Sequence, residues 1–281
     1  MAKISVIVLV HNSQKTIRKC MNALINQTYK NFELIIVDDQ STDKTIEIIQ
    51  SYKDKRITTI NNPNRNNIAS GRNIGFKVAK GDLIFYTDSD CIPLSNWLEE
   101  GVGKINGNDI ITGITFYEYP CHSFKHRVVQ GWDSFFTCNL GFKKSSLEKI
   151  NGFDEKFNLY AEDKDVCFRI LKNGGEKIFN QNMIVIHQTS LRTPKSELKL
   201  YSKFYWGKLL CHFKHGNEPG VKFGIMRPDL LVATIFPPLL LVTETFRSFD
   251  DLKLLPFTWI GLVIGRVRMW VKCLRKGKFY L

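Results

Sequence analysis

The chain has 281 residues, of which 43% are hydrophobic and 24% charged, so it is long enough to bury one large core. These fractions exclude a wholly disordered chain, a collagen-like repeat and a polytopic membrane protein. The net charge of +13 is uneven: residues 1–190 carry 24 basic and 21 acidic side chains, whereas residues 191–281 carry 16 and 6. The last third therefore favours an anionic partner, either lipid headgroups or nucleic acid.

Four short apolar runs in the first 90 residues predict buried parallel strands, because they are rich in Ile and Val and lack polar alternation. Three amphipathic helical patterns lie between them. This alternation predicts βαβ crossovers, and hence an α/β fold with a single Rossmann-like domain and a mostly parallel central sheet. The predicted strands are Ile4–Val10, Glu33–Val37, Arg56–Ile60 and Asp82–Thr87, and the predicted helices are Thr16–Ile25, Asp43–Tyr52 and Ile68–Lys80.

The pattern loosens after the fourth predicted strand. Another strand is predicted at Ile110–Phe116, and an irregular stretch follows it. Two helices come next, one near Ser145–Ile150 and one that begins near Glu162, before a last strand at Met183–Ile186. We therefore expect the α/β domain to occupy residues 1–190.

Residues 191–281 are predicted to form a region of basic amphipathic and apolar helices that associates with a membrane. Its two uncharged stretches, 230–243 and 254–265, have 14 and 12 residues, fewer than the about 20 that a spanning helix needs. The tail from Arg266 carries six basic residues and no acidic one. This pattern indicates insertion into one leaflet, with the charges at its headgroups. We expect peripheral or monotopic binding at the cytoplasmic face of the cell membrane, with a hairpin of two short spans as the alternative.

The cysteines and histidines give weaker signals. Seven scattered cysteines without a C-x-x-C pair indicate neither a disulfide framework nor a zinc ribbon, so reduced thiols in the cytosol are expected. Two histidine pairs, His122 with His126 and His212 with His215, have a spacing that can bind zinc on one helix face. Neither pair has a complete second pair of ligands. For His212 and His215 we favour contact with headgroups or solvent.

Acidic residues follow two of the predicted strands, at the edge where parallel α/β sheets collect ligands. Asp38 and Asp39 follow the second strand. Helix capping explains their neighbour Asp43, but it does not explain two carboxylates at the end of a buried strand. Asp88 and Asp90 follow the fourth strand, and an acidic pair two residues apart can aim both carboxylates at one divalent cation. A solvated turn is the alternative for this pair.

A third acidic group lies at the start of a predicted helix. Glu162, Asp163 and Asp165 favour the helix dipole, but aromatic residues before them indicate a pocket wall, where a carboxylate can act as a general base. The default interpretation of Trp132 is a core residue. The functional hypothesis is that its ring is a platform on which an acceptor sugar stacks. His187 closes a strand and is either an ordinary buried histidine or a metal ligand.

Five blocks of the sequence, in order, resemble family 2 glycosyltransferases. They cover residues 4–187, about two thirds of the chain, and their combination in this order is specific. The chain departs from the family at Asn151, where glycine is usual, and at His11, where many relatives have tyrosine. The blocks are Ile4–Asn12, Gln27–Tyr29 with Phe32–Asp43, Gly71–Gly75, Asp88–Asp90, and Asn151–Glu155 with Glu162–Arg169.

The resemblance implies the GT-A fold, an inverting reaction and a nucleotide-activated sugar bound with Mg²⁺ or Mn²⁺. It implies that Asp163 is the catalytic base and that Asp90, Asp88 and His187 hold the metal ion. Glu162 and Trp132 are assigned to the acceptor side. The residues assigned to the nucleotide are Val10, His11, Asn12, Asp39, Arg72, Asp88 and Ser89.

We therefore expect an inverting, metal-dependent glycosyltransferase. Its donor would be a UDP-, GDP- or dTDP-linked sugar, and its acceptor a hydroxyl or phosphate of a glycan or a polyprenyl-linked lipid. A nucleotidyltransferase acting on sugar phosphates is the alternative enzyme, although the sequence lacks a glycine-rich loop with a basic residue. A basic nucleic-acid-binding protein is the alternative from another class. No recognised binding motif supports it, so no nucleic-acid partner is expected.

Overall fold

The computed structural model describes residues 3–63, 67–118, 127–128, 135–157, 160–188, 193–196, 198–199, 210–211, 214–215 and 255–275. Contacts divide the chain into two units. Unit 1 comprises Met1–Glu118 and Arg127–Thr189, and unit 2 comprises Tyr119–His126 and Ser190–Leu281.

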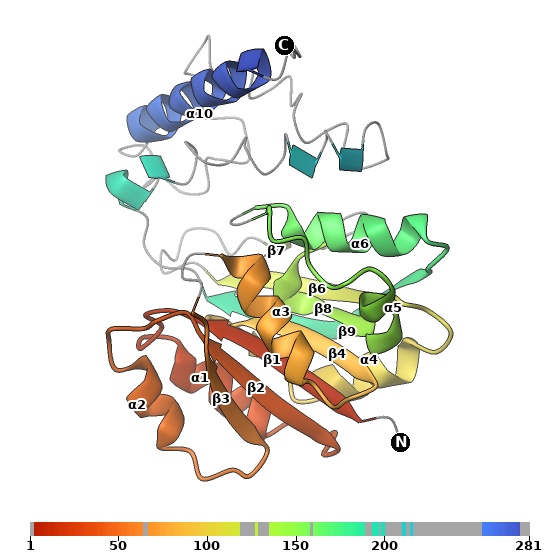
Figure 1. Cartoon of the computed structure of the whole chain (residues 1–281). Coiled ribbons are helices and arrows are strands. Elements are labelled where there is room, and N and C mark those ends of the chain that lie inside the picture. Colours follow the sequence, from red (N-terminus) through yellow and green to blue (C-terminus); the bar gives the residue numbers. More distant parts are fainter. Residues whose placement is uncertain are drawn as a thin grey trace. The chain divides into compact units, whose positions relative to one another are not determined.

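Unit 1 is built on one sheet of nine strands. In chain order they are β1 (Ile4–Val10), β2 (Phe32–Asp38), β3 (Ile57–Asn61), β4 (Leu83–Asp88), β5 (Cys91–Pro93), β6 (Ile110–Glu118), β7 (Arg127–Val128), β8 (Leu140–Lys143) and β9 (Lys177–Gln188). Across the sheet the order is β3-β2-β1-β4-β8-β6-β9-β5, and β7 pairs with β6 (Figure 1). Strands β1 to β4 are parallel, as predicted. Strand β8 runs antiparallel to both of its neighbours, which makes the remaining half mixed.

The helices of unit 1 include all five that the sequence predicts. One further helix, α4, was not predicted, and its two glycines explain why, since glycine disfavours helix interiors. Gly101 of α4 lies against the ring of Phe85, where any side chain would clash. The helices are α1 (Ile17–Ile25), α2 (Thr45–Gln50), α3 (Ile68–Val78), α4 (Trp97–Lys104), α5 (Lys144–Lys149) and α6 (Glu162–Lys172), with a 3₁₀ turn, η1, at Thr137–Asn139.

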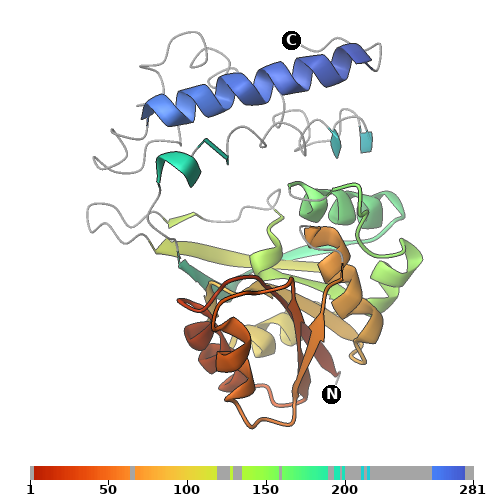
Figure 2. The ribbon, with the colours of Figure 1, turned by 60° about the vertical axis from the view of Figure 1, so that its left-hand side comes forward.

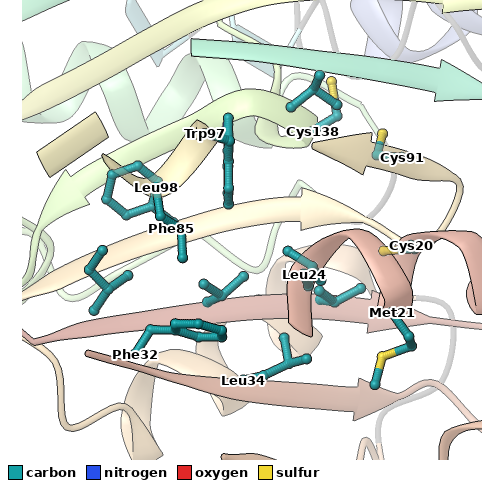
Figure 3. Packing of buried hydrophobic residues seen from close by; sticks show 14 of the residues in the cluster. Cys20, Met21, Leu24, Phe32, Leu34, Phe85, Cys91, Trp97, Leu98 and Cys138 are labelled. Carbon is teal, nitrogen blue, oxygen red and sulfur yellow. The ribbon is translucent and has the colours of Figure 1, made fainter. Parts of the chain in front are cut away.

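Strand β1 is apolar apart from Ser5, because both of its faces are covered. Its even-numbered residues, such as Val6, belong to the buried cluster that includes Met21 and Leu24 of α1 (Figure 3). The opposite face meets α3, where a Cβ added to Gly75 would lie 2.6 Å from Ile7. Burial on both faces removes the polar alternation of a half-exposed strand and brings α3 close to the sheet.

Strand β9 is longer than the predicted Met183–Ile186, and its pairing with β6 shifts in the middle. Gly113 pairs with Asn180, whereas the next residue, Ile114, pairs with Ile184. A side chain on Gly113 would clash with the Met183 carbonyl. Asn139 spans the shift: its Nδ2 donates to the carbonyls of Ile114 (2.9 Å) and Met183 (3.0 Å). These contacts set the register of the last residues of β9.

We expect Asn139→Ala to lower the free energy of unfolding by roughly 2–4 kcal/mol, because buried polar groups would lose their partners. Besides the two carbonyls, Asn139 Oδ1 accepts a hydrogen bond of 2.8 Å from Trp97 Nε1. Urea denaturation followed by circular dichroism measures the change. Asn108→Ala is the control, since this exposed amide donates only to a nearby carbonyl, and it should alter stability by less than about 0.5 kcal/mol. Equal effects of the two substitutions would contradict the structural role of Asn139.

Unit 2 contains the helix α10 (Leu255–Arg275), which continues from the second apolar stretch into the basic tail and runs straight (Figure 2). One of its faces is buried, including Leu262 and Arg266. The other face exposes Ile260, Val267 and Val271, at 39%, 49% and 42% of their surfaces. No helix in the described part of the chain is both long and apolar enough to cross a bilayer.

Candidate active site

The ends of β1, β2 and β4 lie level at one edge of the sheet. In the register of β1, Leu9 pairs with Val37 on one side and with Asp88 on the other. The residues that follow these positions therefore emerge at the same edge. Ser13 and Ser89 join two of the emerging segments, with their Oγ atoms 2.7 Å apart.

The residues that follow β1 and β2 form a connected group. Asp39 donates its backbone N–H to the carbonyl of Val10 (2.8 Å), and His11 donates from Nδ1 to the carbonyl of Asp39 (2.9 Å). Asn62 Nδ2 donates to Asp39 Oδ1 at 2.7 Å. Asn12 adopts a left-handed backbone with a φ of 49°. Sequence reasoning missed Asn62, although it follows β3 at the same edge as the other three strands.

Asp88, Asp90, Cys91 and His187 gather at the end of β4. One ligand atom from each lies within 4.8 Å of the others, and His187 Nε2 is 3.6 Å from Asp90 Oδ1. Two carboxylates and an imidazole form a donor set that suits a divalent cation. The residues predicted as metal ligands are therefore close together, and the fit supports the predicted metal site.

Strand pairing explains how His187 reaches the aspartates. It pairs with Cys91 of β5 on one side and with Tyr117 of β6 on the other, so the three side chains share one face. The ring of Tyr117 stacks on the imidazole, with centroids 4.9 Å apart and planes 20° apart. Gln188 N–H donates to the carbonyl of Asp90 at 2.8 Å. Cys91 and Tyr117 were missed because their proximity depends on this pairing.

The electrostatics of the cluster favour a bound cation. Burial raises the pKa of Asp90 above its ordinary value, and the carboxylate of Asp88 raises it further, while His187 opposes the shift. The negative charge of Asp88, which raises the pKa of Asp90, also attracts a divalent ion. The donor set therefore suits Mg²⁺ or Mn²⁺ in charge as well as in ligand type.

Arg72 of α3 links this cluster to α6. Its Nη1 is 2.5 Å from Glu162 Oε1, and its Nη2 is 3.7 Å from Asp88 Oδ1. Arg72 and Glu162 are both buried, and Glu162 Oε2 has no hydrogen-bond partner among the described residues. Helix α3 is held at its start by Asn67, which accepts a hydrogen bond from Ser70 N–H. The guanidinium thus connects the predicted nucleotide side with the predicted acceptor side.

Asp163 follows Glu162 in the first turn of α6 and is half-buried. Burial raises its pKa to about 7, the neighbouring Glu162 raises it too, and Arg72 opposes the shift. Its Oδ1 accepts a hydrogen bond of 2.8 Å from Lys164 N–H. A carboxylate whose pKa is close to neutral suits a general base at physiological pH.

The turn that follows α5 accommodates Asn151, which stands where family 2 glycosyltransferases usually have glycine. Asn151 and Gly152 both have left-handed backbones, with φ of 57° and 69°, and asparagine tolerates this region better than most residues. Asn73 of α3 fixes the next residue, because its Nδ2 donates to the carbonyl of Phe153 (2.9 Å) and its Oδ1 accepts from Phe153 N–H (2.8 Å). The asparagine is thus compatible with the turn.

Other predicted residues contribute less to this site. Trp132, His122, His126 and His212 lie outside the described residues. The prediction that His215 faces solvent or headgroups is wrong, because only 6% of its surface is exposed. The structure shows buried, free thiols at Cys20, Cys91, Cys138, Cys167 and Cys211.

Comparison with known proteins identifies the family. Residues 5–171, more than half of the chain, match the model of "Glycosyl transferase family 2". The chain therefore belongs to this family, as its sequence blocks predicted. Its fold is similar to that of a mannosyltransferase, PcManGT of Pyrobaculum calidifontis in complex with GDP-Man and Mn²⁺. The TM-score is 0.67 at 17% identity, over 96% of this chain and 88% of that one.

Two curated relatives extend the comparison. Glycosyltransferase GlyG of Streptococcus pneumoniae is 35% identical over 120 residues, covering 41% of this chain and 40% of the relative. The Escherichia coli protein WfaP, a UDP-Glc:alpha-D-GlcNAc-diphosphoundecaprenol beta-1,3-glucosyltransferase, is 43% identical over 90 residues, covering 32% of this chain and 36% of the relative. The chain thus matches less than half the length of these curated relatives.

Proposed function

We propose that the protein transfers a sugar from a UDP-, GDP- or dTDP-linked donor to a glycan or polyprenyl-linked acceptor, with inversion at the sugar carbon. The observation that carries the proposal is the cluster of Asp88, Asp90 and His187 at the shared strand edge, which Arg72 connects to Asp163's helix. The GDP-Man and Mn²⁺ of the structural neighbour support the donor, and the lipid-linked acceptor in the name of WfaP supports the acceptor.

In this mechanism the first strands hold the nucleotide. Asp39, kept in place by Asn62 and His11, accepts hydrogen bonds from the base. Arg72 lies beside the nucleotide, with Asp88 next to the ribose. Asp90, Asp88 and His187 would hold Mg²⁺ or Mn²⁺, which supplies charge neutralisation for the departing diphosphate.

Asp163 supplies the proton chemistry. A sugar or lipid hydroxyl is a weak nucleophile, so its proton must pass to a base as the new glycosidic bond forms. The ionised Asp163 accepts this proton. The described site offers no second carboxylate placed as a nucleophile, since Arg72 binds Glu162, and a single displacement inverts the sugar carbon.

A nucleotide screen tests the proposal. We expect one of UDP, GDP and dTDP, added with Mn²⁺ at about 100 times its Kd, to stabilise the full chain by about 2.7 kcal/mol, a Tm rise of roughly 5–10 °C. The matching nucleotide sugar should then release this nucleotide when a diphosphate-lipid acceptor is added. Turnover with a sugar 1-phosphate and a nucleoside triphosphate instead would favour the nucleotidyltransferase.

We also propose that unit 2 binds the cytoplasmic face of the cell membrane. The exposed face of α10 combines Ile260, Val267 and Val271 with the exposed Arg268 and Arg275. An apolar stripe beside arginines suits an anionic bilayer, because the side chains enter the interface while the charges meet lipid phosphates. Such a location would bring the active site to a polyprenyl-linked acceptor.

Substitution on the exposed face of α10 tests the membrane proposal. We expect Val267→Asp with Val271→Asp to weaken binding to anionic phosphatidylglycerol vesicles by at least about tenfold, through lost apolar burial and added repulsion. Vesicle co-sedimentation of the full chain measures the effect. Val78→Asp is the matched control, because Val78 is 41% exposed on α3 of unit 1. Equal binding by both variants, or equal binding to neutral vesicles, would contradict the proposal.

A further inference from the structure

The metal cluster contains a thiol that Mg²⁺ and Mn²⁺ do not require. These hard cations prefer oxygen ligands, whereas thiolates select softer ions such as Zn²⁺. Cys91 Sγ lies within 4.8 Å of the ligand atoms of Asp88, Asp90 and His187. Its side chain is fully buried, and its S–H faces Asp90 Oδ1 at 3.8 Å. The thiol is therefore directed into the cluster.

The sheet fixes this thiol beside the imidazole. Cys91 and His187 are partners in the antiparallel pairing of β5 with β9, so their side chains stand next to each other on one face. Tyr117 stacks on the far side of the imidazole and limits its rotation. Cys91 and His187 are thus held as neighbours before any ion binds, which lowers the ordering cost of binding.

We propose that Cys91 gives this centre a second coordination mode, in which all four side chains bind Zn²⁺ or Cd²⁺ and so exclude the nucleotide diphosphate. Zinc with four protein ligands is a closed tetrahedral site, without an open position for a phosphate oxygen. The inhibitory part of this inference rests on the proposed function, whereas the binding part does not.

The geometry needs only a small closure. Zinc bonds of about 2.0–2.3 Å place tetrahedral ligands roughly 3.3–3.8 Å apart, compared with the limit of 4.8 Å among the four atoms here. Movements of about 1 Å in the half-exposed side chains of Asp88, at the end of β4, and Asp90, in the turn that follows it, suffice. As the metal–sulfur bond forms, the thiol releases its proton to solvent. No oxidation or reduction is involved.

Neighbouring cysteines provide a control. Cys20 of α1 and Cys138 of η1 lie near Cys91 in the same buried cluster (Figure 3). Cys20 Sγ instead donates to the backbone carbonyl of Asp88 at 3.5 Å, and it is not among the four grouped ligand atoms. A serine at position 20 can make the same hydrogen bond. Cys20→Ser therefore tests whether metal binding depends on Cys91 in particular or on another buried thiol near the site.

Cadmium titration of the full-length chain tests the binding mode. We expect the wild type and Cys20→Ser to show sulfur-to-cadmium charge-transfer absorption that saturates at one equivalent. Cys91→Ser should lose this absorption and bind Zn²⁺ at least about tenfold more weakly. Circular dichroism establishes that the variants are folded. Equal absorption in Cys91→Ser and the wild type, or none in the wild type, would overturn the proposal.

Competition with Mn²⁺ tests the inhibitory part. Zn²⁺ should release Mn²⁺ from the wild type, measured as free Mn²⁺ by electron paramagnetic resonance, and should lower nucleotide affinity in parallel. If the chain binds cadmium through Cys91 but binds no nucleotide, the proposed function is contradicted while the second coordination mode is still supported. A chain that transfers sugar unimpeded with Zn²⁺ bound would overturn the inhibition and keep the proposed function.

Discussion

Replacing Asp163 with asparagine is expected to lower kcat by about 10²–10⁴-fold, the usual range for loss of a general base. The amide cannot accept the proton of the acceptor hydroxyl, while the nucleotide and metal residues stay intact. Single-turnover assays with a matched donor and acceptor measure the loss. Since the proposed base would act only on the acceptor, the Kd for nucleotide with Mn²⁺ should change by less than about threefold.

The pH profile of the wild type checks the same residue. Because the pKa of Asp163 is about 7, log(kcat/KM) should fall with a slope of one below pH 7 and level off above it. The raised pKa also means that the folded chain binds this proton more tightly than the unfolded chain, so stability is lost as pH rises through 7. Asp163→Asn should therefore have a Tm no lower than the wild type at pH 8. A wild-type profile flat from pH 5 to 8 would contradict the assignment.

Asp90→Asn is expected to lower kcat/KM by about 10³-fold, or ~4 kcal/mol of transition-state stabilisation, because the predicted cation loses a charged ligand. Calorimetric titration should show Mn²⁺ affinity falling with activity, and excess Mn²⁺ should restore part of the rate. The proposed ligand His187 stays in place, so the variant should keep a weakened site rather than none.

The control for Asp90 lies at the other end of the same strand. Asp82 precedes β4, is exposed, and accepts a hydrogen bond from Lys3 N–H at 3.2 Å. Asp82→Asn should leave Mn²⁺ affinity and rate within about twofold of the wild type. If Asp90→Asn retains full turnover in the presence of EDTA, the metal role of this cluster is wrong.

The parallel half of the sheet was predictable because three of its strands, β1, β2 and β4, are buried on both faces. Runs such as Ile4–Val10 are almost wholly apolar, and this composition indicates that both faces are covered. The mixed half was not predictable in this way. Strand β8 has four residues and includes Gly141, whose missing side chain leaves room for Phe85 and Ile111. Its identity depends on neighbours distant in sequence, which no local pattern reveals.

The residues of the candidate site also differ in how far the sequence predicts them. Asp39, Asp88 and Asp90 were predicted because each follows a strand whose end lies at the ligand edge of a parallel sheet. The role of Cys91 beside His187 required the pairing of β5 with β9. That pairing joins residues almost a hundred positions apart, and composition and spacing carry no trace of it.

Because of the register shift opposite Gly113, the direction of the His187 imidazole depends on the number of residues in the last part of β9. Asn139 anchors the strand at Met183, and alternate residues beyond that anchor point to opposite faces of the sheet. One codon gained or lost between Ile184 and His187 would turn the ring away from the aspartates, with every catalytic side chain still encoded. A single insertion or deletion in this segment, rather than a substitution, would therefore be enough to remove a proposed metal ligand while the other site residues stay in place.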